Sequence, residues 1–153
     1  MSFIHKSVWV QFLITLFISY HYMDSFAYLF NSSQLNDEKY TELLIFTAFQ
    51  LVVLNIIVSS IVAIFSNKNE IEQQRDERDD LIALKGRSAA YNLLSVWVII
   101  IVVQLWLKTI PGAYYFFDQL SAEYNVLNFL LVGFLIAEIV RFSTKLYYYY
   151  RGF

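Results

Sequence analysis

The feature that most restricts the fold is a long apolar run, residues 43–65, which contains no charged side chain. It exceeds the roughly 20 apolar residues that a helix needs to cross the hydrocarbon core of a bilayer. Apart from Gln50 and Asn55 it is apolar on every side. That pattern is typical of a helix in lipid rather than one on a globular surface. The run therefore predicts a membrane-spanning helix.

Three further runs are long and predominantly apolar, although each contains at least one charged residue; they are residues 7–29, 89–108 and about 126–148. Of the 153 residues, 58% are hydrophobic and 16% are charged, against about 25% charged in a typical soluble domain. We therefore expect an all-α membrane protein. Residues 1–153 would form a single domain, a bundle of four transmembrane helices.

The first run also has a second interpretation as a cleaved signal peptide. Lys6 precedes it, and the small residues Ser25 and Ala27 occupy the two cleavage-recognition positions. Asp24 is unusual at such a position, so a membrane span is the favoured interpretation.

Lysine and arginine are distributed unequally between the two sides of this topology. Cytoplasmic segments retain positive residues, and nine of the 11 cations fall on one side. They are Lys6, Lys68, Arg75, Arg78, Lys85, Arg87, Arg141, Lys145 and Arg151, against Lys39 and Lys108 on the other side. We therefore expect a multi-pass protein of the cell (inner) membrane, with both termini and residues 66–88 in the cytoplasm.

Within the charged segment, residues 66–88, the part from residue 75 to residue 88 is expected to continue as a helix into the third span. No proline interrupts residues 75–88, so this part would form a cytoplasmic helical extension. At about 100° per residue its side chains sort by type. Arg75, Arg78, Ile82 and Lys85 share one side, Asp76, Asp79 and Asp80 the adjacent side, and Leu81 and Leu84 a third. Gly86 and Ala90, four residues apart, allow close approach of another helix.

Three interpretations of this segment stay open. The charges can simply face water on a solvated extension. They can instead form a docking surface for another chain, made of Arg75, Asp76, Arg78, Asp79, Asp80, Lys85 and Arg87. Carboxylates at helical spacing can also hold a divalent cation, which is disfavoured here because no histidine or second acidic segment is nearby.

The sequence D-E-R-D-D-L-I at residues 76–82, with Arg87 and Tyr91 leading into an apolar helix, resembles the signature of a family of small four-span prokaryotic membrane proteins of unknown function. The second half of the chain fits this resemblance through Glu138 and Arg141 and through the terminal Y-R-G at residues 150–152. Members often carry two basic residues before that glycine, where this chain has Tyr150 and Arg151. The resemblance implies the four-span fold and says nothing about activity.

Glu138 is the most informative position inside an expected span. A charge at the centre of a membrane helix costs about 2.5–3.5 kcal/mol on insertion scales, so it usually faces a partner or a cavity. Arg141 lies one turn away, and a structural ion pair near the cytoplasmic end is the favoured interpretation. The alternative is a carboxylate that handles protons or cations.

His21 and Asp24 are also one turn apart, near the outer end of the first span. They supply only half of a metal site, because His5 is expected on the opposite side of the membrane. A hydrogen-bonded polar pair is favoured. The remaining polar side chains of the spans are expected to form hydrogen bonds between helices; they are Gln11, Gln50, Asn55, Gln104 and Asn128.

Catalysis is the class of function with the least support. The chain has no cysteine and only four glycines, which excludes thiol chemistry and makes a phosphate-binding loop hard to build. No cofactor or metal motif is present, and the net charge of −2 gives no reason to expect nucleic acid binding.

The favoured function is that of a membrane accessory, regulatory or interaction protein that docks a partner through its charged helix. Such a protein would lie in the lipid bilayer as a homo-oligomer or as a subunit of a membrane complex. The alternative is a small oligomeric transporter or channel that uses Glu138.

The unequal distribution of cations leads to a topology that reporter fusions can test. Fusions at Asn36 and Ala122 should report the outside, and fusions at Glu70 and Phe153 the cytoplasm. A C-terminus outside the cell would contradict this topology.

Overall fold

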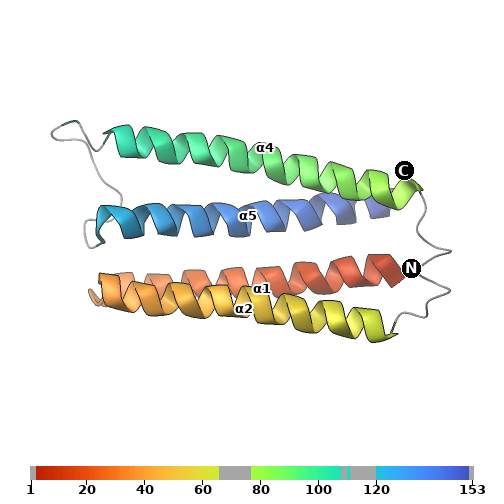
Figure 1. Cartoon of the computed structure of the whole chain (residues 1–153), viewed down its shortest axis with the longest axis horizontal. Helices are drawn as coiled ribbons and strands as arrows, with labels where there is room; N and C mark the ends of the chain where they lie inside the picture. The colour runs from red at the N-terminus through yellow and green to blue at the C-terminus, as the bar shows by residue number, and fades with distance from the viewer. Residues whose placement is uncertain (1–2, 66–76, 108–109, 111–119, 152–153) are drawn as a thin grey trace.

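The computed structural model describes residues 3–65, 77–107, 110 and 120–151. This part of the chain contains four long helices, α1 (Phe3–Asn31), α2 (Asp37–Phe65), α4 (Glu77–Leu107) and α5 (Ala122–Arg151), as Figure 1 shows. It contains no strand, which confirms the all-α prediction.

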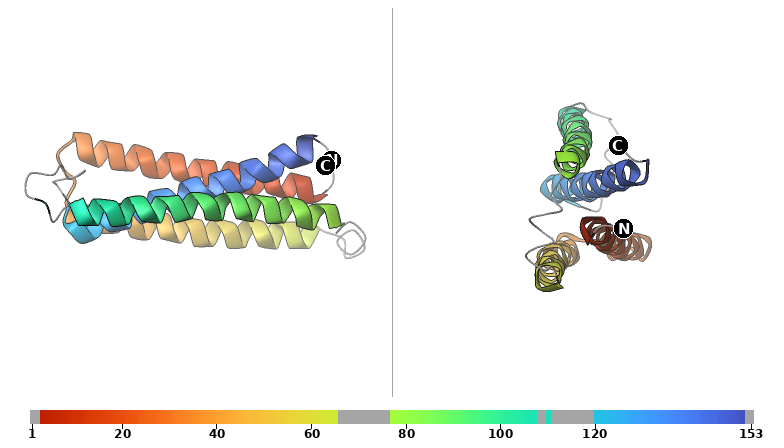
Figure 2. Two further views of the ribbon diagram at one scale, coloured as in Figure 1. Left: turned by 90° about the horizontal axis from the view of Figure 1, so that it is seen from above. Right: turned by 90° about the vertical axis from the view of Figure 1, so that its right-hand side faces the viewer.

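The helices lie side by side in the order α4, α5, α1, α2 (Figures 1 and 2). Helix α5 packs against α4 on one side and against α1 on the other, and α1 packs against α2. Each of these neighbouring pairs is antiparallel, since residues near the end of one helix contact residues near the start of the other. Helix α5 is therefore the central element that joins the α1–α2 pair to α4.

Three of the four helices, α2, α4 and α5, are long and apolar enough to cross a membrane. Most of their apolar surface faces outward: for example, Ile64 is 77% exposed, Ile99 is 62% exposed and Val52 is 59% exposed. Soluble monomers rarely expose contiguous apolar patches of this extent. The protein is therefore embedded in a membrane, where lipid covers these side chains. Helix α1 has the same length as α2, but ionisable residues, among them His21 and Asp24, lie within its apolar run.

The turn between α1 and α2 is set by local hydrogen bonds. Ser33 has a φ of 55°, and the Gln34 and Ser33 amides donate to the carbonyls of Leu29 and Phe30 at 3.1 Å each, which is the Schellman arrangement that ends a helix. Asn36 then caps α2, since its side-chain oxygen accepts a hydrogen bond from the Lys39 amide at 2.9 Å. These two caps bring α2 back alongside α1.

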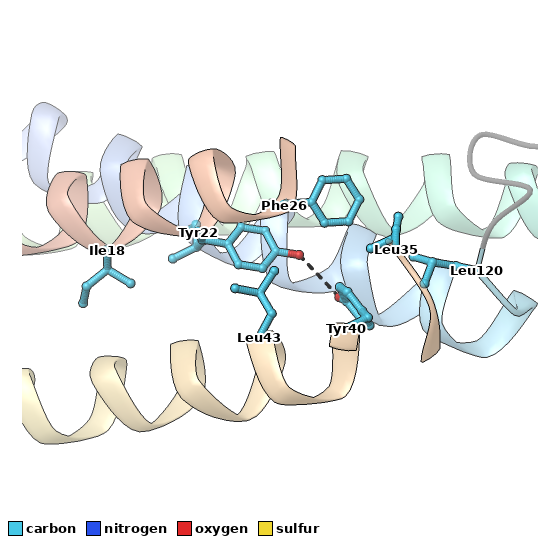
Figure 3. Packing of buried hydrophobic residues seen from close by; sticks show 8 residues of the cluster. Ile18, Tyr22, Phe26, Leu35, Tyr40, Leu43 and Leu120 are labelled. Atoms are coloured by element: carbon cyan, nitrogen blue, oxygen red, sulfur yellow. Dashed lines mark hydrogen bonds between the residues drawn. The ribbon is translucent and has the colours of Figure 1, made fainter. Parts of the chain in front are cut away.

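The largest core lies where α1, α2 and α5 meet (Figure 3). It is built on aromatic side chains: Tyr22 and Tyr40 are 1% and 0% exposed, and Phe26 stacks on Tyr22. The Tyr22 hydroxyl donates a 2.5 Å hydrogen bond to the side-chain oxygen of Asn128 on α5. A buried hydroxyl needs such a partner, so this bond fixes the register of α1 against α5.

Helices α4 and α5 pack closely along small residues. The Trp97 indole lies directly over Gly133, where a Cβ atom would overlap the ring. The indole N–H of Trp97 also donates a 2.7 Å hydrogen bond to the Phe129 carbonyl. One turn of α5 thus supplies both the space for the ring and the acceptor for its polar atom.

The helices extend beyond the predicted spans. Helix α2 begins at Asp37 rather than at residue 43, and α5 covers Ala122–Arg151 rather than residues 126–148. The extra turns contain polar residues, which is why the predicted apolar spans exclude them. These residues are nevertheless compatible with a helix. Helix α4 runs unbroken through Gly86, as predicted. Pro111 and Gly112, a pair that ends helices and that follows the third predicted span, lie outside the described residues.

Replacing Gly133 with Ala should destabilise the protein, although Ala is the better helix former. The added methyl group forces the Trp97 ring out of its place, at a cost of about 1–3 kcal/mol for overpacking. Thermal unfolding in detergent measures the effect. Val52→Ile, which adds one carbon at an exposed position of α2, should leave the midpoint unchanged, and an equal response of the two variants would contradict this packing.

Candidate functional site

The N-terminal part of α4 is held against the C-terminal part of α5. A Cβ atom on Gly86 would lie 2.9 Å from the Arg141 carbonyl oxygen and 2.9 Å from Cγ of Lys145, so only glycine fits at this distance. Four residues earlier Ile82 is 1% exposed. The Tyr149 hydroxyl donates a 2.9 Å hydrogen bond to the Asp79 carboxylate. Three successive turns of α4 are therefore fixed to α5.

The docking residues predicted from the sequence separate into two groups in the structure. Asp79 points toward α5, since its carboxylate binds Tyr149. The remaining described members lie on the exposed surface of α4; they are Arg78, Asp80, Lys85 and Arg87. Arg75 and Asp76 lie outside the described residues. One carboxylate of the acidic side, that of Asp79, therefore forms a contact within the protein and is not presented to a partner.

The exposed face of this segment also carries large apolar side chains. Leu81 and Leu84 are 48% and 59% exposed and lie one turn apart, on the side of α4 away from Ile82. Arg78 and Lys85 border them on one edge, and Asp80 borders them on the other. We call Leu81 and Leu84 with these three charged residues the α4 surface.

Glu138 and Arg141 form the predicted ion pair. Arg141 Nη2 lies 2.6 Å from Glu138 Oε2, and the Arg141 and Glu138 side chains are 32% and 20% exposed. The guanidinium of Arg141 also lies 4.5 Å from the centre of the Phe142 ring. Its Nε is buried and has no hydrogen-bond partner among the described residues. The geometry fits a structural pair, because the carboxylate is already engaged.

His21 and Asp24 line an open groove of about 760 Å³ between α1 and α2, together with Lys39, Glu42 and other residues. The His21 ring packs between Phe17 and Phe46. The predicted hydrogen bond between His21 and Asp24 is not found in the described part of the chain, where His21 Nδ1 has no partner. No group of three potential metal ligands occurs in that part either.

The polar residues expected to join helices behave differently from one another. Asn128 does so, through Tyr22. The prediction for Asn55 is wrong, because its amide donates to the Leu51 carbonyl of its own helix at 2.6 Å. Gln50 has a buried side-chain oxygen without a partner among the described residues. The side-chain amide of Asn55 is exposed and has no neighbouring helix within reach in the described part of the chain, so it forms its hydrogen bond with the backbone of its own helix.

Nothing in the sequence indicates the polar contacts at the opposite end of α5. The Thr41 and Tyr124 hydroxyls form a 3.1 Å hydrogen bond, and the Ser121 amide donates to the Asp37 carboxylate at 3.1 Å. Tyr40 and Tyr124 meet edge to face with ring centres 5.7 Å apart. These contacts join the start of α2 to the start of α5, and they involve residues distant in sequence that share no motif.

Comparison of the chain with protein-family models, with curated proteins and with solved structures found no match. The resemblance to a family of four-span membrane proteins therefore stays a prediction from residues 76–91 and the C-terminal half.

Removing Arg141 alone should destabilise the protein more than removing both members of its ion pair. Arg141→Met leaves the Glu138 carboxylate without its cation, at a cost of about 1–3 kcal/mol, whereas adding Glu138→Gln removes the unpaired charge. Unfolding in detergent measures both. Glu123→Gln, an exposed carboxylate of the same helix, is the control, and equal losses in the single and double variants would show that the pair contributes no coupling.

Proposed function

We propose that this protein is a four-span accessory or regulatory protein of the cell (inner) membrane, with both termini in the cytoplasm. Its function would be to bind a partner through the α4 surface. Helix α1 would be the fourth span, because it is as long as α2 and packs along both α2 and α5. Two polar side chains of α1 are shielded from lipid: Tyr22 has buried hydrogen-bond partners, and Thr15 is only 5% exposed. This shielding reduces the free-energy cost of placing α1 in the membrane.

The observation that carries this proposal is the exposure of Leu81 and Leu84 on a charged helix. Six of the side chains in residues 77–87 are charged, namely Glu77, Arg78, Asp79, Asp80, Lys85 and Arg87. Because charges are costly in lipid, they keep this part of α4 in water, and lipid does not cover the two leucines. Exposed apolar side chains on a water-facing helix favour an interaction site.

The shape of the α4 surface fits a partner helix. Leu81 and Leu84 lie one turn apart on a segment that α5 holds rigid, as in the helix-against-helix mode of peptide recognition. Arg78 and Lys85 on one edge would pair with acidic side chains of the partner. The expected partner segment is therefore an amphipathic helix with an acidic edge, from a second copy of this chain or from another protein.

A photo-crosslinking amino acid at Leu84 tests this proposal in cells. We expect one discrete adduct, whose formation is lost in Leu81→Ser and kept in Leu81→Met, because methionine preserves the apolar contact. The mass of the adduct identifies a second copy of this chain, which would add 18.1 kDa, or another protein. The control is the same amino acid at Phe49, which is 63% exposed on α2 and faces lipid.

An adduct at Leu84 that is indifferent to both changes at Leu81 would contradict the proposal. So would the absence of any adduct specific to Leu84.

A further inference from the structure

Helices α4 and α5 change from apolar to charged at the same level. The apolar run of α4 begins at Ala89, soon after Arg87, and the uncharged part of the α5 run ends at Ala137, before Glu138, Arg141 and Lys145. Gly86 lies against Arg141 and Lys145, so the two transitions are beside each other. Four tyrosines, residues 147–150, follow on α5, and aromatics of this kind are enriched at membrane–water interfaces. This level therefore marks a membrane surface.

Three cations gather at this level, and we call Arg87, Arg141 and Lys145 the cationic cluster. Arg87 directly follows Gly86, the residue that lies against Arg141 and Lys145. The charges that surround the Lys145 ammonium include those of Arg87, Arg141 and Glu138. Glu138 is already paired with Arg141. Three positive charges against one negative charge leave the cluster with a net positive charge.

Lys145 is held in place by packing rather than by an ion pair. Its aliphatic chain crosses α4 at Gly86, and its ammonium lies 5.5 Å from the centre of the Phe142 ring. Within the described residues no carboxylate lies within ion-pair distance of it. The side chain is therefore ordered in advance for an anion that the protein itself does not supply.

The surroundings of the cluster favour a lipid as the source of that anion. Phe134 lies on the same side of α5 as Glu138 and Arg141, toward the middle of the membrane, and is 43% exposed. An anionic headgroup at the cluster would continue into acyl chains along this apolar surface. Basic pockets between membrane helices bind lipid headgroups in this way.

We propose that Arg87, Arg141 and Lys145 form a binding site for the phosphate of an anionic phospholipid. The site is distinct from the α4 surface, which lies on the side of α4 away from α5. It also needs no partner protein, so the purified chain is sufficient to test it.

Titration of the detergent-solubilised protein with phosphatidylglycerol or phosphatidylcholine, read by native mass spectrometry, measures the binding. We expect the protein to retain phosphatidylglycerol in preference to phosphatidylcholine. Arg87→Gln should weaken phosphatidylglycerol binding about fivefold, and Arg87→Gln with Lys145→Gln about 25-fold, as expected for the loss of one and two surface cations. Lys39 lies at the start of α2, at the end of the molecule opposite the cationic cluster, so the Lys39→Gln variant should bind phosphatidylglycerol like the unchanged protein.

Two further measurements distinguish a lipid site from a loss of folding and from a site for free phosphate. Lys145→Arg keeps the charge and should keep the preference for phosphatidylglycerol, which ties weaker binding of the glutamine variants to the lost charge. Inorganic phosphate at the same concentration should not displace the lipid. Displacement by inorganic phosphate, equal binding of the two lipids, or equal binding by the Arg87→Gln and Lys39→Gln variants would each overturn the proposal.

Discussion

The close approach of α4 to α5 is the contact on which the other features depend, because lipid gives apolar helices little reason to associate. Lipid tails are as apolar as leucine, so membrane helices associate through tight packing and hydrogen bonds. Here Gly86 and Gly133 provide the space, and Trp97 and Tyr149 provide hydrogen bonds between the two helices. The contact extends from the apolar part of α4 into its charged part, which is why the charged part is ordered.

Because α5 lies between α4 and α1, it makes different contacts at its two ends. At one end, the buried hydroxyl of Tyr22 on α1 bonds to Asn128 on α5 and to Tyr40 on α2. At the other end, α4 and α5 bring together charges of both signs at the level where the apolar runs stop. The first end holds the helices in register, and the second presents the α4 surface and the cationic cluster to its surroundings.

The sequence predicts the helices well because membrane spans depend on local composition. The absence of charge in residues 43–65 and the lack of proline in residues 75–88 are enough to predict α2 and the unbroken α4. The Glu138–Arg141 pair is predictable for the same reason, since both members lie on one helix. Contacts between helices cannot be predicted in this way. The roles of Tyr22 and Tyr149 depend on which helix faces meet, and a helix that is apolar on every side has no sequence pattern that specifies its packing face. For this reason the sequence alone places Asp79 on a surface for a partner, whereas its carboxylate binds α5.

Amide hydrogen exchange of the protein in lipid nanodiscs tests most directly whether α5 holds the charged part of α4 as ordered helix. We expect the amides of residues 79–88 to exchange slowly, with protection close to that of residues 89–95 in the adjoining span. Exchange of residues 79–88 at the rate of an unfolded chain, with residues 89–95 still protected, would contradict this role of α5.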